Sequence, residues 1–206
     1  MSNPNEDLAY IKDVAEKGRS VPLVGGANFV IWGGVIGTAG LLQYLRGVGV
    51  SLPFSSMVMW IGALVLGWIL SFFWSSRIRH EEGARSFSNQ AAGVAWGSCG
   101  VFMTVYFFSL LGAMFFYQGS EIPMSFLFAT MFPVAFGIYA IAFAVSATVS
   151  QEKWMYYVSL FSLLMMPVMI FTIPHNYSML LAALGTYGAV MVPGWILWRN
   201  QRKASG

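Results

Sequence analysis

Charged residues are scarce in this chain: Asp, Glu, Lys and Arg make up 9% of its 206 residues. Soluble domains carry about one quarter charged residues, so a chain that is 57% apolar needs surroundings other than water. The apolar content excludes a disordered chain, and the single cysteine, Cys99, excludes a scaffold held by disulfides. A net charge of only +3 argues against nucleic acid as a partner. The class that remains is a polytopic membrane protein.

Six uninterrupted apolar runs dominate the sequence. Each run has at least the roughly 20 residues that a helix needs to cross a hydrocarbon core about 30 Å thick, and none contains Asp, Glu, Lys or Arg. Membrane strands would alternate polar and apolar residues, and these runs do not. The sequence therefore predicts an all-α membrane protein with six transmembrane helices. We expect them at residues 22–45, 54–75, 91–117, 123–148, 154–173 and 179–198.

Basic residues between the runs indicate how the chain is oriented, because cytoplasmic connections are enriched in Lys and Arg. With six helices both termini lie on one side, and that side collects all the basic residues except Arg46. We therefore expect a multi-pass protein of the bacterial inner (plasma) membrane with both termini in the cytoplasm. The basic residues on that side are Lys12, Lys17, Arg19, Arg77, Arg79, Arg85, Lys153, Arg199, Arg202 and Lys203.

Polar segments flank the six runs at both ends. Residues 1–21 predict a short cytoplasmic helix in which Leu8, Ile11 and Ala15 form a narrow apolar stripe. This segment carries four acids and three bases, whereas a helix that lies on a membrane surface is usually basic. The stripe is therefore a candidate docking surface, with a protein partner, the chain's own inner loops and lipid as the open alternatives. Residues 199–206 are expected to form a basic cytoplasmic tail.

Glycines spaced four residues apart occur in the first and third runs. Gly33 and Gly37 form one such pair, and Gly93 and Gly97 form the other. Small residues let transmembrane helices approach closely, which matters because the hydrophobic effect contributes little between helices in lipid. We predict that the four glycines pack helices together. The first helix against the third is one arrangement, and a face between copies in a homo-oligomer is the alternative.

Two prolines lie near the middle of the fourth and fifth runs, Pro133 and Pro167. A proline inside a helix leaves the carbonyl four residues earlier without its hydrogen bond and bends the helix. Helices that are broken in mid-membrane form the binding site in many transporters, although such bends also occur where there is no site. The two prolines are therefore candidate helix bends and candidate residues of a solute path.

Groups suited to catalysis or to metal binding are few. Proton-coupled carriers, ion pumps and carboxylate-bridged metal enzymes need ionisable groups inside the membrane, and the runs contain no acid, base or histidine. His80 and His175 are expected on opposite sides of the bilayer, so they cannot share a haem, and with one cysteine they are too few for a zinc site. We expect no catalytic residue, no cofactor and no metal.

The polar groups deep in the runs are neutral. They are expected to satisfy backbone carbonyls or to bridge neighbouring helices, and Trp32 and Trp96 are expected to pack between helices. The deep hydroxyl groups are those of Thr38, Ser98, Thr104, Thr130, Ser146 and Ser162.

These observations favour a non-enzymatic integral membrane protein in contact with the lipid bilayer. Our first interpretation is a membrane-embedded subunit, or an accessory or signalling partner, that contacts another protein through its cytoplasmic face. The alternative is a transporter or channel for a small neutral or apolar solute. A third hypothesis, an intramembrane hydrolase, rests on Ser98 alone. The residues around Ser98 depart from the Gly-x-Ser-Gly pattern, and His175 is expected near the other side of the membrane.

Overall fold

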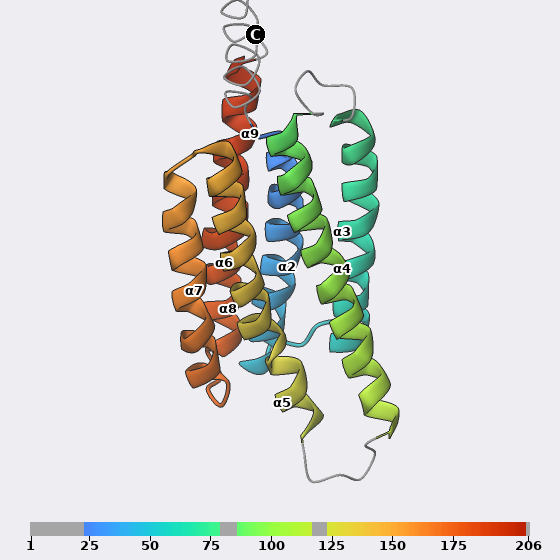
Figure 1. Ribbon diagram of the computed structural model, residues 1–206. Coiled ribbons are helices and arrows are strands. Elements are labelled where there is room, and N and C mark those ends of the chain that lie inside the picture. The colour runs from blue at the N-terminus through green and yellow to red at the C-terminus, as the bar shows by residue number, and fades with distance from the viewer. Residues whose placement is uncertain (1–22, 79–85, 117–122, 205–206) are drawn as a thin grey trace, which may run out of the picture.

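The computed structural model describes residues 23–78, 86–116 and 123–204, and all of its regular elements are helices (Figure 1). Six helical segments are long and apolar enough to cross a membrane. The predicted all-α fold with six spans is confirmed, and the chain is a polytopic membrane protein. The helix expected in residues 1–21 lies outside the described residues.

The six spans begin and end within a few residues of the predicted runs. Two of them are interrupted: the fourth contains α5 and α6, and the last contains α8, the π-helical turn η1 and α9. The residues expected to form a basic tail continue α9 as far as Ala204. The helices are α2 (Gly26–Gly47), α3 (Ser56–Ile78), α4 (Phe87–Phe116), α5 (Met124–Ala129), α6 (Met131–Ser150), α7 (Trp154–Thr172), α8 (Ser178–Thr186), η1 (Tyr187–Met191) and α9 (Val192–Ala204).

Proline accounts for the position of both interruptions. Thr130 separates α5 from α6, three residues before Pro133, which has no N–H to donate to the carbonyl of Ala129 at the end of α5. Pro193 stands in the first turn of α9, directly after η1. Pro167 differs, because it lies inside α7 and that helix continues to its end without a break.

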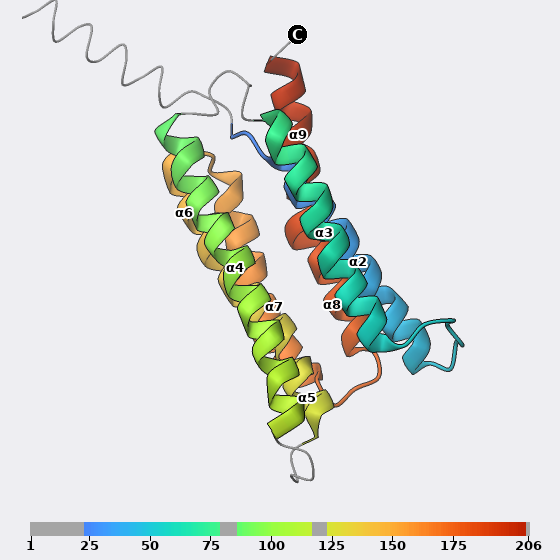
Figure 2. The same ribbon diagram turned by 90° about the vertical axis from the view of Figure 1, so that its right-hand side faces the viewer.

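The spans form two layers (Figure 2). The first layer contains α2, α3 and the last span, and the second contains α4, α5, α6 and α7. In the first layer α2 packs on both α3 and the last span, and in the second α6 packs on both α4 and α7. Each layer is therefore built around one central helix.

Glycines in α2 permit its close approach to the last span. A Cβ atom at Gly33 would lie 2.5 Å from the backbone nitrogen of Met191, and one at Gly37 would lie 2.5 Å from the ring of Tyr187. Both glycines therefore pack on η1, whereas the third span was one of the two neighbours considered from the sequence. Gly93 and Gly97 in α4 behave differently, because a Cβ atom at either position would meet nothing within 4 Å.

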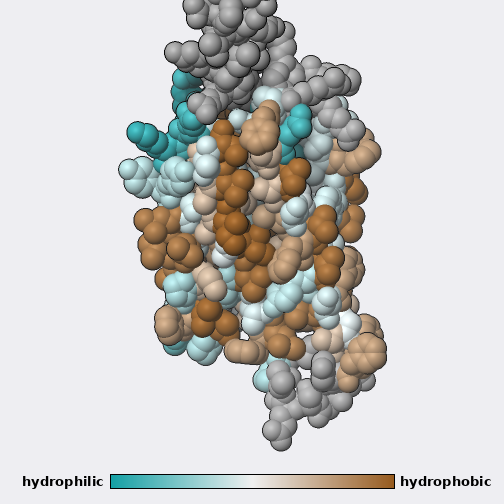
Figure 3. All heavy atoms as spheres, in the orientation of Figure 1, coloured by the Kyte–Doolittle hydropathy of each residue, from teal (hydrophilic) through white to brown (hydrophobic). Residues whose placement is uncertain are grey.

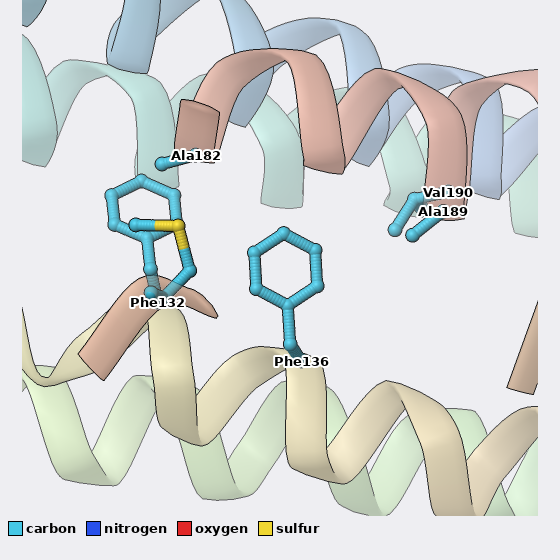
Figure 4. Packing of buried hydrophobic residues seen from close by; sticks show 6 residues of the cluster. Phe132, Phe136, Ala182, Ala189 and Val190 are labelled. Atoms are coloured by element: carbon cyan, nitrogen blue, oxygen red, sulfur yellow. The ribbon is translucent and has the colours of Figure 1, made fainter. Parts of the chain in front are cut away.

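A buried apolar cluster joins the two layers along one edge of the bundle. The rings of Phe132 and Phe136 in α6 lie beside small side chains of the last span, which leave room for them (Figure 4). Phe136 is completely buried. The cluster contains Phe132, Phe136, Met169, Ala182, Ala189 and Val190.

The surface agrees with a protein that spans a bilayer. The face seen in Figure 3 is apolar over the middle of the helices, and hydrophilic side chains gather toward one end. We call that end, which carries Lys153, Arg199 and Arg202, the basic end. The opposite end carries Arg46, whose guanidinium donates a hydrogen bond to the carbonyl of Phe54 across the connection between α2 and α3. We call it the Arg46 end.

Candidate functional site

A cavity of about 810 Å³ lies between the two layers. Residues of α2, α3, α4, α5, α6 and the last span line it. Sites for small organic ligands usually occupy about 300–1,000 Å³, so the cavity has room for a molecule of substantial size. We call it the interlayer cavity.

The interlayer cavity follows most of the length of the bundle. On α2 its lining extends from Gly26 near the basic end to Gln43 near the Arg46 end. At a rise of 1.5 Å per residue, these positions are about 25 Å apart along the helix. On α4 the lining extends from Ala92 to Met114. The cavity is therefore an elongated space.

Its walls are aromatic and carry no formal charge. None of the described residues that line it is Asp, Glu, Lys, Arg or His. Four indole rings line it: Trp32, Trp60, Trp68 and Trp96. The ring centroids of Trp32 and Trp68 are 5.6 Å apart in an edge-to-face arrangement, and that of Trp60 lies 5.9 Å from that of Phe132. These separations are typical of favourable aromatic pairs.

Two of these indoles are tied to hydroxyl groups across the bundle. The Trp96 Nε1–H of α4 donates to Ser146 Oγ of α6 at 3.1 Å. The Trp68 Nε1–H of α3 donates to Thr104 Oγ1 of α4 at 3.3 Å, and that hydroxyl donates in turn to the Gly100 carbonyl at 2.8 Å. Ser146 and Thr104 thus bridge neighbouring helices, which is the role expected for them.

The other deep hydroxyl groups divide into two kinds. Thr38 Oγ1 lies 3.0 Å from the Tyr187 hydroxyl and links α2 to η1, and Thr130 Oγ1 lies 2.6 Å from the hydroxyl of Tyr106 in α4. The Ser162 Oγ is buried without a hydrogen-bond partner among the described residues. Ser98 is exposed on α4. Of these four hydroxyl groups, those of Thr38 and Thr130 therefore join helices.

The two edges of the bundle differ. The apolar cluster of α6, α7 and the last span closes one edge, whereas α3 and α4 face each other at the other edge. In the most apolar 18-residue stretch of α3 and of α4 only 11% of the residues are buried, compared with 50% in that of the last span. Trp68 reaches across this second edge to Thr104, and a Cβ atom at Gly100 would lie 3.7 Å from its ring. We call this side the α3–α4 edge.

The predicted site residues lie in different places. Gly93 and Gly97 line the interlayer cavity, where they leave open space. Pro133 is buried in α6 and Pro167 is exposed on α7, and the cavity lining does not include either proline. The stripe of Leu8, Ile11 and Ala15 lies outside the described residues. The proposed solute path along the prolines therefore stays a prediction.

Sequence reasoning did not find the cavity itself. It did identify Trp32 and Trp96 as tryptophans too deep for the headgroup layer, and both line the cavity. The depth of Trp60 in its run, and the small residues opposite the rings, were signals of the same kind. Cys99, the only cysteine of the chain, also lines the cavity and lies on α4, as Trp96 does. Within the described ranges no three side chains of His, Cys, Asp or Glu come together.

No family model matches the chain, and no curated protein or solved structure matches it.

Proposed function

We propose that this protein is a non-enzymatic, multi-pass protein of the bacterial inner membrane that binds an uncharged apolar molecule in the interlayer cavity. The elongated cavity would carry this molecule between the basic end and the Arg46 end of the bundle. The proposal follows the second of the two main interpretations of the sequence, a transporter or channel for a small neutral or apolar solute.

The observation that carries the proposal is the uncharged, aromatic lining of the 810 Å³ cavity. A charged ligand would lose its hydration there without gaining a counter-ion, which is costly in an apolar site. An apolar ligand needs no counter-ion there, and its surface gains dispersion contacts with the aromatic walls. The lining therefore selects for neutral, apolar molecules.

The non-enzymatic part of the proposal rests on the same lining. General acid–base catalysis most often uses His, Asp, Glu or Lys side chains that hold or release a proton. The described residues around the cavity supply none of these groups. Its polar side chains are hydroxyls, amides, indoles and one thiol, and two of the indoles already bind hydroxyl groups on other helices.

The experiment fills the cavity from one of its own walls. Replacing Gly97 by Phe places a ring in the cavity, and the Cβ atom at this position meets nothing within 4 Å, so the helix itself is not forced apart. Protein in lipid nanodiscs is photolabelled with an uncharged alkyl diazirine, and an excess of unlabelled alkyl compound serves as competitor. We expect saturable adducts on the cavity face of α4 in the original protein and their loss in Gly97→Phe.

A matched control comes from the same helix. Gly112 also has open space around its Cβ position, but it does not line the cavity. Gly112→Phe should therefore retain the saturable adducts that Gly97→Phe loses. Equal labelling of the original protein and Gly97→Phe, or labelling that competitor does not reduce, would contradict the proposal.

A second function is supported by the basic end, where α9 extends past α6 and α7 (Figure 1). Arg199, Arg202 and Lys203 are exposed there, and the Arg202 guanidinium lies 4.4 Å from the centre of the Trp198 ring. Such a cationic helix end suits an acidic surface on a protein partner. This feature supports our first interpretation of the sequence, an accessory subunit or signalling partner that contacts another protein from the cytoplasm.

Affinity capture from native membranes in mild detergent separates the two functions. A protein recovered in stoichiometric amount, and lost from a variant with Arg199→Gln, Arg202→Gln and Lys203→Gln, would support the accessory role. The same variant should keep the saturable photolabelling, because its three changes lie outside the cavity. Recovery of the protein alone would speak against the accessory role and leave the binding role intact.

A further inference from the structure

We propose that the ligand of the interlayer cavity is an uncharged lipophilic molecule with a flat ring that bears carbonyl oxygens and with an apolar chain, the class to which isoprenoid quinones belong. This inference rests on the proposed function and names the chemistry of its ligand. Three properties of the cavity lead to it: its flat aromatic walls, its unused hydrogen-bond donors and its length.

The first property is the flat aromatic walls. The Trp32 ring lies on α3 so closely that a Cβ atom at Gly67 would come within 2.7 Å of it, and its edge-to-face contact with Trp68 fixes its plane further. Trp60 is packed in a similar way against Phe132. Indole faces attract the edges and offset faces of other rings, and such pairs are worth more than the area they bury. A ligand with a flat ring uses these surfaces better than a flexible acyl chain does.

The second property is a pair of hydrogen-bond donors that the protein does not use. Trp68 and Trp96 donate their N–H groups to hydroxyls, but the Trp32 and Trp60 N–H groups have no acceptor in the part of the chain that the structure describes. Both indoles are half-buried and line the cavity, and an indole N–H in apolar surroundings is more stable with an acceptor than without one. A ligand that supplies oxygen acceptors would satisfy both donors.

Other tryptophans do not show the same deficit inside the membrane. Trp154 donates to a carboxylate oxygen of Glu152 at 3.1 Å. Trp74 and Trp195 each contact Trp198 edge-to-face at the basic end, where headgroups and water can accept their hydrogen bonds. Away from the basic end, the indoles without an acceptor among the described residues are therefore Trp32 and Trp60, and both line the cavity.

The uncharged lining of the cavity favours a neutral oxygen acceptor over a charged one. A carboxylate or phosphate would bring a negative charge into a lining that offers no Lys, Arg or His among the described residues. A carbonyl oxygen accepts the same hydrogen bonds without charge, so it avoids the cost of burying an ion. Carbonyl groups on a ring thus match the donors and the electrostatics together.

The length of the cavity fits the remaining part of the ligand. The Trp32 ring lies beside Gly67 of α3. Gly67 follows Trp60 by seven residues on that helix, so the Trp32 and Trp60 indoles are about 10 Å apart along the bundle. The lining on α2 is about 25 Å long, which leaves space beyond a ring for an apolar chain. The thioethers of Met57, Met103 and Met179 contribute adaptable surface there.

Cys99 provides the measurement, because it is the only cysteine and it lines the cavity. A lipophilic maleimide is reacted with Cys99 in nanodiscs, and three compounds are tested as protectants. Decylubiquinone has both the ring and the carbonyls, decylbenzene has the ring alone, and monodecanoylglycerol has a carbonyl without the ring. We expect decylubiquinone to slow the labelling at concentrations at least about tenfold lower than the other two compounds.

Two double variants then test the donors. Trp32→Phe with Trp60→Phe keeps a ring at both positions and removes the two N–H groups, and it should weaken protection by decylubiquinone about fivefold or more, the factor for one lost hydrogen bond of about 1 kcal/mol. Trp74→Phe with Trp195→Phe removes two N–H groups at the basic end and should leave protection unchanged. Labelling without any protectant reports whether each variant keeps the original structure around Cys99.

The outcomes distinguish this inference from the proposed function. Equal protection by decylbenzene or monodecanoylglycerol would overturn the ligand class and still agree with an apolar binding cavity. No protection by any of the three compounds, together with unchanged labelling in Gly97→Phe, would overturn the proposed function as well. The comparison of the three compounds needs only the original protein, so it stands even if the tryptophan variants fail to fold.

Discussion

Single glycines decide how closely α2 approaches the last span. Gly33 and Gly34 are neighbours in the same helix, but they face different surroundings. The backbone of Met191 stands where a side chain at Gly33 would go, whereas nothing lies within 4 Å of a Cβ at Gly34. Backbone atoms cannot move aside as the end of a flexible side chain can, so the first position tolerates no Cβ atom without a shift of a whole helix.

Gly33→Ala should therefore lower the free energy of unfolding by about 1–3 kcal/mol, the usual cost of forcing an extra methyl group into a packed site. Gly34→Ala is the control and should be neutral or stabilising by up to about 1 kcal/mol, because alanine favours a helix more than glycine does. Thermal unfolding in detergent measures both. Equal stability of the two variants would show that η1 does not confine this face of α2.

Individual residues also show what a sequence can reveal about a site. Gly33 and Gly37, which the sequence marked by their spacing, lie where α2 approaches the last span closely, and only small residues permit such an approach. The same spacing at Gly93 and Gly97 has another use, since these two leave space in a cavity wall. Spacing describes one helix, and it contains no information about whether a neighbour fills the space.

At the level of helices, the α3–α4 edge is the place where the bundle is held by few contacts. Trp68 and Thr104 connect the two helices there with a hydrogen bond of 3.3 Å. Hydrogen bonds between transmembrane helices are worth roughly 0.6–2 kcal/mol. The loss of this one should therefore let molecules from the bilayer reach the cavity more easily.

Thr104→Val removes the hydroxyl acceptor and keeps nearly the same volume. We expect a lipophilic maleimide to react with Cys99 roughly threefold to tenfold faster in this variant, in line with a loss of about 1 kcal/mol. Thr148→Val is the control, because the Thr148 hydroxyl bonds with the Ala144 carbonyl and the Tyr156 hydroxyl, which belong to α6 and α7. An unchanged rate in Thr104→Val would mean that the reagent enters elsewhere.

Helices were the part of the fold that the sequence predicted best. Long apolar runs have one stable form in a bilayer, so their positions follow from hydropathy alone, and the observed spans match them. The interruptions were harder to predict. Pro133 and Pro167 have the same local chemistry, but the break at Thr130 lies close to the first, while α7 continues past the second. The presence of a proline therefore does not by itself predict a break.

For the whole molecule, the grouping of spans into layers could not be derived from the sequence. The first layer combines the first, second and last spans, so it depends on contacts between segments at opposite ends of the chain. No local pattern specifies such a contact. The interlayer cavity exists only because of this grouping, which explains why its aromatic residues could be recognised one by one but not as a site.

The orientation of the whole molecule gives a further prediction. Basic residues gather at one end, so we expect that end in the cytoplasm. In a Cys99→Ala background, a cysteine replacing Val50 in the exposed connection between α2 and α3 should react with a membrane-impermeant maleimide in intact cells. A cysteine replacing Lys203 at the exposed end of α9 should react only after lysis. The reverse pattern would invert the assigned orientation.

The π-helical turn η1 changes which side chains the rest of the last span presents to its neighbours. A π turn holds more residues than an α turn, and each additional residue advances the helix by about 100°, so α9 is out of phase with α8. This phase brings Gly194 against α2, where a Cβ atom would lie 2.5 Å from the Cβ of Phe29. A deletion of one residue between 187 and 191 would preserve the hydropathy of the span and still rotate every later side chain by more than a quarter turn. Length and hydropathy alone would not reveal such a difference between two related chains.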